Sequence, residues 1–153
     1  MNSLELKLPP PVVALVTAFL MWLATRLVPA LALPYAVGKS AVLAPVLIGI
    51  GISLSGIVAF RRAKTTASPL RPSAASSLVT GGVYRFTRNP MYLGLLLVLL
   101  GWALFLRNGA AFVLLPCFML YLNRFQIAPE ERALASRFGE AFDAYKNRTR
   151  RWI

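Results

Sequence analysis

Four hydrophobic stretches divide the 153-residue chain, and their lengths are close to those of membrane-crossing helices. They cover residues 12–33, 41–60, 91–106 and 110–125. Crossing the hydrocarbon core of a bilayer takes about 20 helical residues, within a range of about 17–25. The first two stretches meet this length. The last two are slightly short and are separated only by the turn-forming triplet Arg-Asn-Gly. The pattern therefore predicts two spans followed by a helical hairpin, about four spans in all.

After the last hydrophobic stretch the pattern changes to that of an amphipathic helix. Pro129 suits the first turn of a helix, and Glu130 and Glu131 suit the positive end of its dipole. Hydrophobic residues from Leu134 to Tyr145 then recur at steps of three and four. We expect a helix over residues 129–148 that lies on the cytoplasmic face, packed on the long loop or on lipid headgroups.

The segment between the second and third stretches, residues 61–90, begins rich in Ser, Thr, Pro and Gly, which predicts a loop. Together, the four hydrophobic stretches and the tail helix predict an all-α fold class: a multi-pass transmembrane helix bundle of about four spans, with a C-terminal amphipathic cytoplasmic helix. We expect residues 1–153 to form a single integral-membrane domain.

Composition and charge agree with the membrane interpretation. Hydrophobic residues make up 58% of the chain and the net charge is +12. A basic soluble protein would suggest nucleic-acid binding, but here the charges avoid the hydrophobic stretches. The long loop carries six basic residues and no acid: Arg61, Arg62, Lys64, Arg71, Arg85 and Arg88. The tail from Arg124 onward carries seven more, whereas the other two loops hold only Lys39 and Arg107. The positive-inside rule places both termini in the cytoplasm, in a protein of the cell (inner) membrane.

The chain contains no histidine and a single cysteine, Cys117, which lies within a hydrophobic stretch. Histidine is the commonest general base and metal ligand. Its absence argues against a zinc site and against a Ser-His-Asp triad, so we expect no metal. Any chemistry must rely on carboxylates, arginines, tyrosines and a reactive cofactor.

Two polar segments next to hydrophobic stretches are the candidate site. The first is "YRFTRNPMYLG", residues 84–94, in which Pro90 moves Asn89 out of helical geometry and makes it a candidate helix cap. Gly94 allows a second backbone or a flat ligand to approach closely. The second is "PEER", residues 129–132, whose two acids continue the buried stripe of the tail helix. Two inward acids facing a basic cluster suit a cationic ligand group.

These segments resemble a known family. "GGVYRFTRNPMYLG", followed by "PEERALASRFGEAFDAYKNRTRRW", is similar to the isoprenylcysteine carboxyl methyltransferase and phospholipid methyltransferase superfamily. Its members are small integral-membrane enzymes that use S-adenosylmethionine and form S-adenosylhomocysteine. The resemblance covers about residues 80–152. The family pattern usually reads Arg-His-Pro, and here Asn89 replaces the histidine, which puts any role for an imidazole proton in doubt.

The resemblance implies a cofactor pocket with two walls. One wall would contain Tyr84, Arg88, Asn89, Pro90, Tyr92 and Gly94. The other would contain Glu130 and Glu131, which would bind the amino or ribose hydroxyl groups of the cofactor. Arg124 would bind the cofactor carboxylate or an acidic substrate group. The residues implied as catalytic are Arg88, Asn89 and Glu131.

The implied function is methyl transfer from S-adenosylmethionine to a lipid or lipidated small-molecule acceptor, such as an isoprenylcysteine-like carboxylate or a phospholipid amine. Two alternatives stay open. A membrane NADPH-dependent sterol-type or isoprenoid-type reductase can carry a similar segment before a helix, although the chain has no GxGxxG dinucleotide fingerprint. The protein could also be a non-catalytic, lipid-binding membrane scaffold. The sequence identifies neither the acceptor nor the oligomeric state.

Overall fold

The computed structural model describes residues 5–34, 38–65 and 76–153, which are mostly helical. An isolated bridge between Ala32 and Asn108 is the sole β pairing in these ranges. The α-helices are α1 (Pro10–Leu27), α2 (Lys39–Arg62), α3 (Pro90–Leu106), α4 (Gly109–Leu122), α5 (Ala128–Phe138) and α6 (Glu140–Arg148). The expected all-α bundle is confirmed. Residues 66–75 of the expected long loop, including Arg71, lie outside the described residues.

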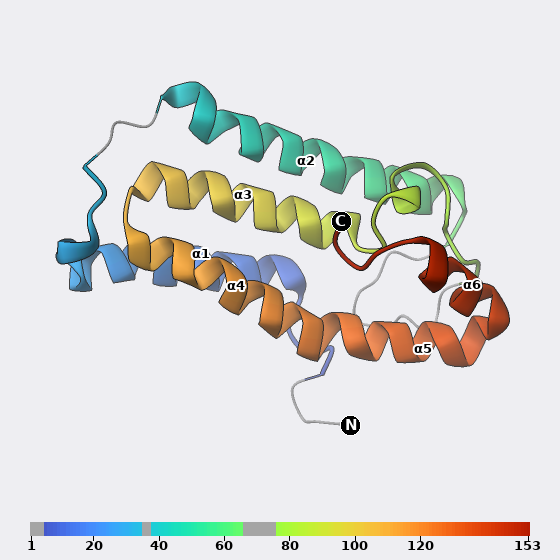
Figure 1. The fold of residues 1–153 in the computed structure, drawn as a ribbon. Coiled ribbons are helices and arrows are strands. Elements are labelled where there is room, and N and C mark those ends of the chain that lie inside the picture. The colour runs from blue at the N-terminus through green and yellow to red at the C-terminus, as the bar shows by residue number, and fades with distance from the viewer. Residues whose placement is uncertain (1–4, 35–37, 66–75) are drawn as a thin grey trace.

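Helix α3 lies at the centre of the bundle, with α2 on one side and α1 and α4 on the other (Figure 1). Small residues permit the close contact of α2 with α3. A Cβ atom added to Gly49 would lie 2.5 Å from the backbone oxygen of Gly94, which is closer than real side chains allow. Ser53 completes this contact by donating a hydrogen bond to the Met91 carbonyl at 3.3 Å. Gly49, Ser53 and Gly56 thus form a face of small residues that lets α2 approach α3 closely.

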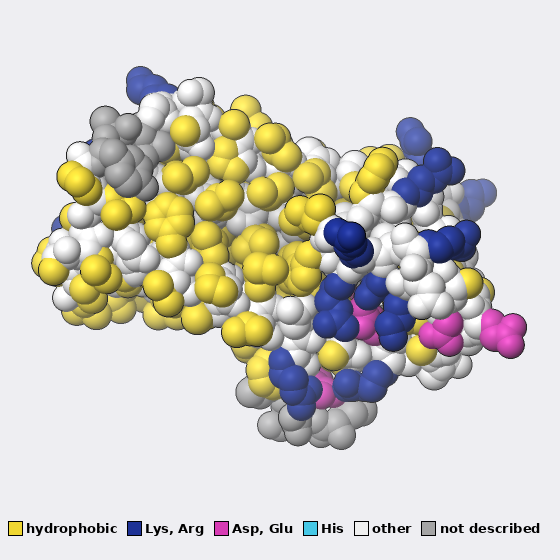
Figure 2. Space-filling view, in the orientation of Figure 1, with side chains coloured by type: hydrophobic (Ala, Val, Ile, Leu, Met, Phe, Trp, Pro, Cys, Tyr) yellow, Lys and Arg dark blue, Asp and Glu magenta, His cyan; other side chains and the backbone are white. Residues whose placement is uncertain are grey.

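The outer surface of the bundle is suited to lipid. Large hydrophobic side chains point outward from α1, α2, α3 and α4, among them Leu15, Leu47 and Val113, which are 71%, 64% and 63% exposed. Three helices are long and apolar enough to cross a membrane: α1, α2 and the continuous helix Gly109–Phe138. Helix α3 is apolar but has 17 residues. Hydrophobic side chains cover the bundle, and most Lys and Arg gather at the end that carries α5 and α6 (Figure 2).

The first hydrophobic stretch forms a shorter helix than expected. Helix α1 ends at Leu27, and residues Pro29–Leu31 form one turn of 3-10 helix. Pro29 has no N–H group, so it cannot continue the α-helical hydrogen bonds.

The predicted tight turn of the helical hairpin is present between α3 and α4. Arg107 adopts a left-handed conformation (φ 50°), and the side chain of Asn108 accepts a hydrogen bond from the Ala110 N–H at 2.9 Å.

The expected single tail helix over residues 129–148 is wrong in two respects. First, Pro129 does not start a helix, because α4 continues into α5 through a π-helical turn, Asn123–Ile127. The wider π turn accommodates a proline within a continuous helix. Second, the helix breaks at Gly139, whose φ of 49° suits glycine. The chain turns there, and α6 packs back against the bundle through Phe142 and Tyr145.

The π turn also fixes the N-terminal segment. Pro129 cannot donate to the carbonyl of Phe125, and the N–H of Leu6 donates to that oxygen instead, at 3.1 Å. The side chain of Gln126 donates to the carbonyl of Leu8 at 2.5 Å. Residues 5–8 are therefore attached to the helix where α4 becomes α5.

Candidate active site

Arg88 joins the two polar segments singled out in the sequence. Its side chain is 10% exposed, and Nη2 lies 2.9 Å from Oε1 of Glu131. Nη1 donates to the carbonyl of Lys146 at 3.0 Å and also to the carbonyl of Thr149. Nε is buried and has no hydrogen-bond partner within the described part of the chain. Arg88 thus binds an acid of α5 and two carbonyl groups near the end of α6, and retains one buried N–H.

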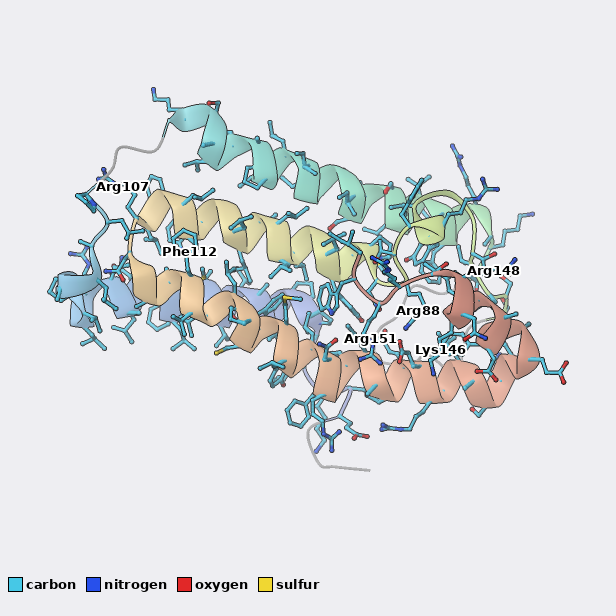
Figure 3. The ribbon with its side chains drawn as sticks, viewed as in Figure 1. Arg88, Arg107, Phe112, Lys146, Arg148 and Arg151 are labelled. Carbon is cyan, nitrogen blue, oxygen red and sulfur yellow. The ribbon has the colours of Figure 1, made fainter. Side chains whose placement is uncertain are left out.

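Glu131 is bound by two arginines. Besides Arg88, Arg151 approaches it with Nη2 at 2.5 Å from Oε2 and Nε at 3.2 Å from Oε1. The labelled side chains of Arg88 and Arg151 lie between the C-terminal segment and α5 (Figure 3). Burial of this carboxyl opposes its ionisation. The hydrogen bonds and charges of Arg151 and Arg88 outweigh that effect and hold the pKa of Glu131 below its usual value. Glu131 is a fixed negative charge.

Glu130 has a different environment, although it is the next residue. The hydroxyl group of Tyr92, on the first turn of α3, donates a hydrogen bond to Glu130 Oε1. Glu130 lies in α5, beyond the hydrophobic stretch that ends at Phe125. Burial raises the pKa of Glu130 to about 8; the bond from Tyr92 opposes this rise and the charge of Glu131 adds to it. Glu130 can therefore exchange a proton near neutral pH.

The C-terminal segment passes beside the Arg-Asn-Pro turn and is hydrogen-bonded to it. The N–H of Arg88 donates to the Arg150 carbonyl at 3.0 Å. The Thr87 hydroxyl and the Asn89 side-chain amide donate to the Arg151 carbonyl at 3.2 and 2.9 Å. Asn89 therefore occupies the N-cap position of α3 without capping it by its side chain, contrary to expectation. The amide supports the C-terminal segment that carries Arg151.

Three residues predicted for the cofactor wall have packing contacts instead. A Cβ on Gly94 would overlap the Ser53 hydroxyl and the Gly49 backbone oxygen, so Gly94 admits helix α2 rather than a flat ligand. Pro90 is fully buried and lies against Gly56. Tyr84 is 4% exposed, and its ring meets that of Phe60 edge-on at 5.4 Å. Cofactor contact by Pro90 and Tyr84 stays a prediction. Beside Gly94, helix α2 occupies the space that a ligand would need.

Arg124 does not join this cluster. Its Nη1 lies 2.9 Å from Oε1 of Glu5, and Arg132 binds the other oxygen of Glu5 at 2.7 Å. Hydrogen bonds from Arg124 and Arg132 hold the pKa of Glu5 below its usual value. A contact of Arg124 with a cofactor stays a prediction, and the geometry gives this residue a different anionic partner.

Sequence reasoning missed Arg151, which is among the closest partners of Glu131. It belongs to a run of basic residues near the C-terminus, and nothing in the pattern separates it from Arg150. The adjacent Trp152 was a signal, because an aromatic residue next to a charged tail suggests anchoring. Its indole Nε1 donates to Asn123 Oδ1 at 3.0 Å, which fixes the end of the tail to the π turn.

The fold and site together define an all-α membrane bundle with a partly buried cluster of acids, arginines and a tyrosine at its charged end. The chain belongs to the phospholipid methyltransferase family, whose match covers residues 39–141, more than half of its length. The match includes Tyr84 to Gly94 and both acids, and it excludes α1 and the segment that carries Arg151.

Two relatives extend this comparison. The chain is 49% identical over 63 residues to an uncharacterized protein of Haemophilus influenzae, a match of 41% of this chain and 100% of that protein. It is 35% identical over 101 residues to the protein-S-isoprenylcysteine O-methyltransferase of Schizosaccharomyces pombe. That match covers 64% of this chain and 37% of the yeast protein, so the chain spans little more than a third of this relative. No solved structure matches the chain.

Proposed function

We propose that this protein transfers a methyl group from S-adenosylmethionine to a lipophilic acceptor at the cytoplasmic face of a membrane. The observation that carries the proposal is the convergence of Arg88, Tyr92, Glu130 and Glu131 at the charged end of an apolar bundle. Family membership supports methyl transfer as the reaction. The acceptor would be an isoprenylcysteine-like carboxylate or a phospholipid amine.

The residues of the cluster fit this cofactor. S-Adenosylmethionine carries an amine, ribose hydroxyl groups, a carboxylate and a positively charged sulfonium. Glu130, which accepts a hydrogen bond from the neutral hydroxyl of Tyr92, is suited to a cationic group. Arg88 Nε, which is buried and lacks a partner within the described residues, is suited to an anionic or hydroxyl oxygen. Glu131 is held by two arginines and would position Arg88 rather than bind the ligand directly.

The cofactor supplies an activated methyl group, and the protein needs to align the acceptor and exclude water. A carboxylate acceptor is already nucleophilic and needs no base. An amine acceptor loses a proton, and Glu130 is the better candidate to accept it, because its pKa is raised to about 8 while that of Glu131 is lowered. The C-terminal segment, bonded to Thr87 and Asn89, would help to exclude water.

The proposed topology places the site where both substrates can reach it. With four spans, α3 being the short one, both termini and the α5–α6 end lie in the cytoplasm of an inner membrane. The excess of Lys and Arg at that end supports this orientation. A soluble cofactor would enter from the cytoplasm and a lipophilic acceptor from the bilayer.

The test is calorimetric titration of detergent-solubilised protein with S-adenosylmethionine and, separately, with NADPH. Glu130→Gln should lose most of the affinity for S-adenosylmethionine, whereas Glu140→Gln, an exposed acid at the start of α6, should keep it. Binding of NADPH instead would indicate the reductase. Binding of neither ligand would favour a lipid-binding scaffold and would refute the proposal.

A further inference from the structure

The pair of arginines around Glu5 lies at one end of an apolar groove. The groove runs between α1 and α4, has a volume of about 290 Å³ and is lined by residues that include Leu8, Val12, Cys117 and Tyr121. The rings of Tyr121 and Phe125 meet at a tilt, with their centroids 4.9 Å apart, and the guanidinium of Arg124 lies over the Phe125 ring at 5.4 Å. The mouth of the groove is therefore within one helical turn of Arg124.

The π turn aligns the two arginines. A spacing of eight residues would leave Arg124 and Arg132 about 80° apart around a regular α-helix. A π turn contains an additional residue, which reduces that difference and brings both side chains to the same side. The single carboxylate of Glu5 accepts from both of them, at 2.9 and 2.7 Å. The two guanidinium groups thus already converge on an anion.

This cluster faces away from the candidate active site. Glu130 and Arg132 are two residues apart on α5, which separates their directions by about 200°. Glu130 meets Tyr92 of α3, whereas Arg132 meets the N-terminal segment. The groove also depends on residues of α1, which lie outside the region that matches the family. The feature is therefore separate from the methyl-transfer site.

The cluster of Arg124, Arg132 and Glu5 carries one excess positive charge, since the two arginines share the single carboxylate of Glu5. The arginine side chains are 51% and 57% exposed, while that of Glu5 is 4% exposed. Each guanidinium carries five N–H donors, so both have donors for a second acceptor. The headgroup of an anionic phospholipid keeps the negative charge of its phosphodiester, which the choline cation offsets in phosphatidylcholine, and arginine binds phosphate well. An apolar groove below such a group suits an acyl chain.

We propose that Arg124 and Arg132 bind the headgroup phosphate of an anionic bilayer phospholipid whose acyl chain occupies the groove between α1 and α4. The lipid binds beside Glu5 as a resident lipid and is not the methyl acceptor. Each arginine near an anionic headgroup contributes about 1 kcal/mol, so loss of both weakens lipid binding about thirtyfold.

Cys117 provides the test, because it lines the groove, is exposed and is the single cysteine of the chain. The assay measures the rate of Cys117 alkylation by a lipophilic maleimide, with the protein in phosphatidylcholine nanodiscs with and without phosphatidylglycerol. We expect phosphatidylglycerol to slow alkylation of the wild-type protein. The Arg124→Gln/Arg132→Gln variant should lose this protection. Arg61→Gln/Arg62→Gln, which removes the same charge from exposed residues of α2, should keep it.

A second variant separates lipid binding from attachment of the N-terminal segment. Glu5→Gln weakens the same ion pairs but leaves both arginines, so protection by phosphatidylglycerol should persist or increase. Loss of protection in Glu5→Gln as well as in the double arginine variant would show that the arginines only hold the segment, and would overturn the proposal. Equal alkylation with and without phosphatidylglycerol in the wild-type protein would also overturn it. So would transfer of labelled methyl to the protecting phosphatidylglycerol, because the lipid would then be an acceptor.

Discussion

Replacing Gly94 by alanine tests whether this residue serves helix packing or ligand binding. The new Cβ would lie 3.1 Å from Ser53 Cβ and would overlap both the Ser53 hydroxyl and the Gly49 backbone oxygen. Overpacking of this kind costs about 1–3 kcal/mol, and the upper part of the range applies because a backbone atom cannot rotate away. Alanine in place of glycine within a helix returns up to about 1 kcal/mol. The net loss in stability is about 2 kcal/mol.

Thermal unfolding in detergent measures this loss. A change of 2 kcal/mol corresponds to a fall in Tm of about 4–8 °C for a chain of this size. Gly51→Ala is the matched control, since Gly51 lies inside a helix, α2, as Gly94 does in α3, and nothing lies within 4 Å of a Cβ at Gly51. It should leave Tm unchanged or raise it. A Gly94→Ala protein with unchanged Tm but weakened S-adenosylmethionine binding would refute the packing role and restore the role predicted from the sequence.

Three further predictions concern the site. The affinity for S-adenosylmethionine should rise with pH by up to about tenfold per unit below pH 8 and then level off, because a cationic ligand needs Glu130 ionised and the pKa of Glu130 is raised to about 8. Titrations between pH 6 and 9 in the wild-type and Glu130→Gln proteins check this, and a pH-independent affinity of the wild-type protein would contradict it. Arg151→Gln should cost about 1–2 kcal/mol of stability, measured by chemical denaturation, because the variant loses the hydrogen bonds from Arg151 to Glu131. An equal loss in Arg150→Gln would show a general charge effect instead. Asn89→His should keep Tm within a few degrees, since an imidazole N–H can also donate to the Arg151 carbonyl; a large fall would show that only the amide fits.

The sequence was sufficient for the fold class because hydrophobic length and charge distribution are properties of the chain itself. Helices α1 to α4 and the turn at Arg107 follow from these patterns. The helix ends were harder to predict. Pro129 reads locally as a helix start, and only the π turn, together with Leu6 as substitute donor, allows the helix to continue through it.

The site was partly predictable for a similar reason. Arg88, Tyr92, Glu130 and Glu131 stand out because polar residues next to hydrophobic stretches need an explanation, and the structure brings all four together. Two partners were not predictable, namely Glu5 for Arg124 and Arg151 for Glu131, since both lie in charged terminal segments without periodicity. Gly94 shows the limit of the glycine argument: the sequence indicates a close approach but does not identify what approaches.

The measurement that tests the account most directly is transfer of labelled methyl from S-adenosylmethionine into the lipid-extractable fraction of membranes that contain the protein. The wild-type protein and the Glu140→Gln control should transfer label, whereas Glu130→Gln and Arg88→Gln should lose nearly all transfer. Because Arg88→Gln removes a buried partner of Glu131, its folding is checked by Tm in the same preparation. Label transfer that persists in a folded Glu130→Gln protein, or no transfer above membranes without the protein, would contradict the proposed site and function.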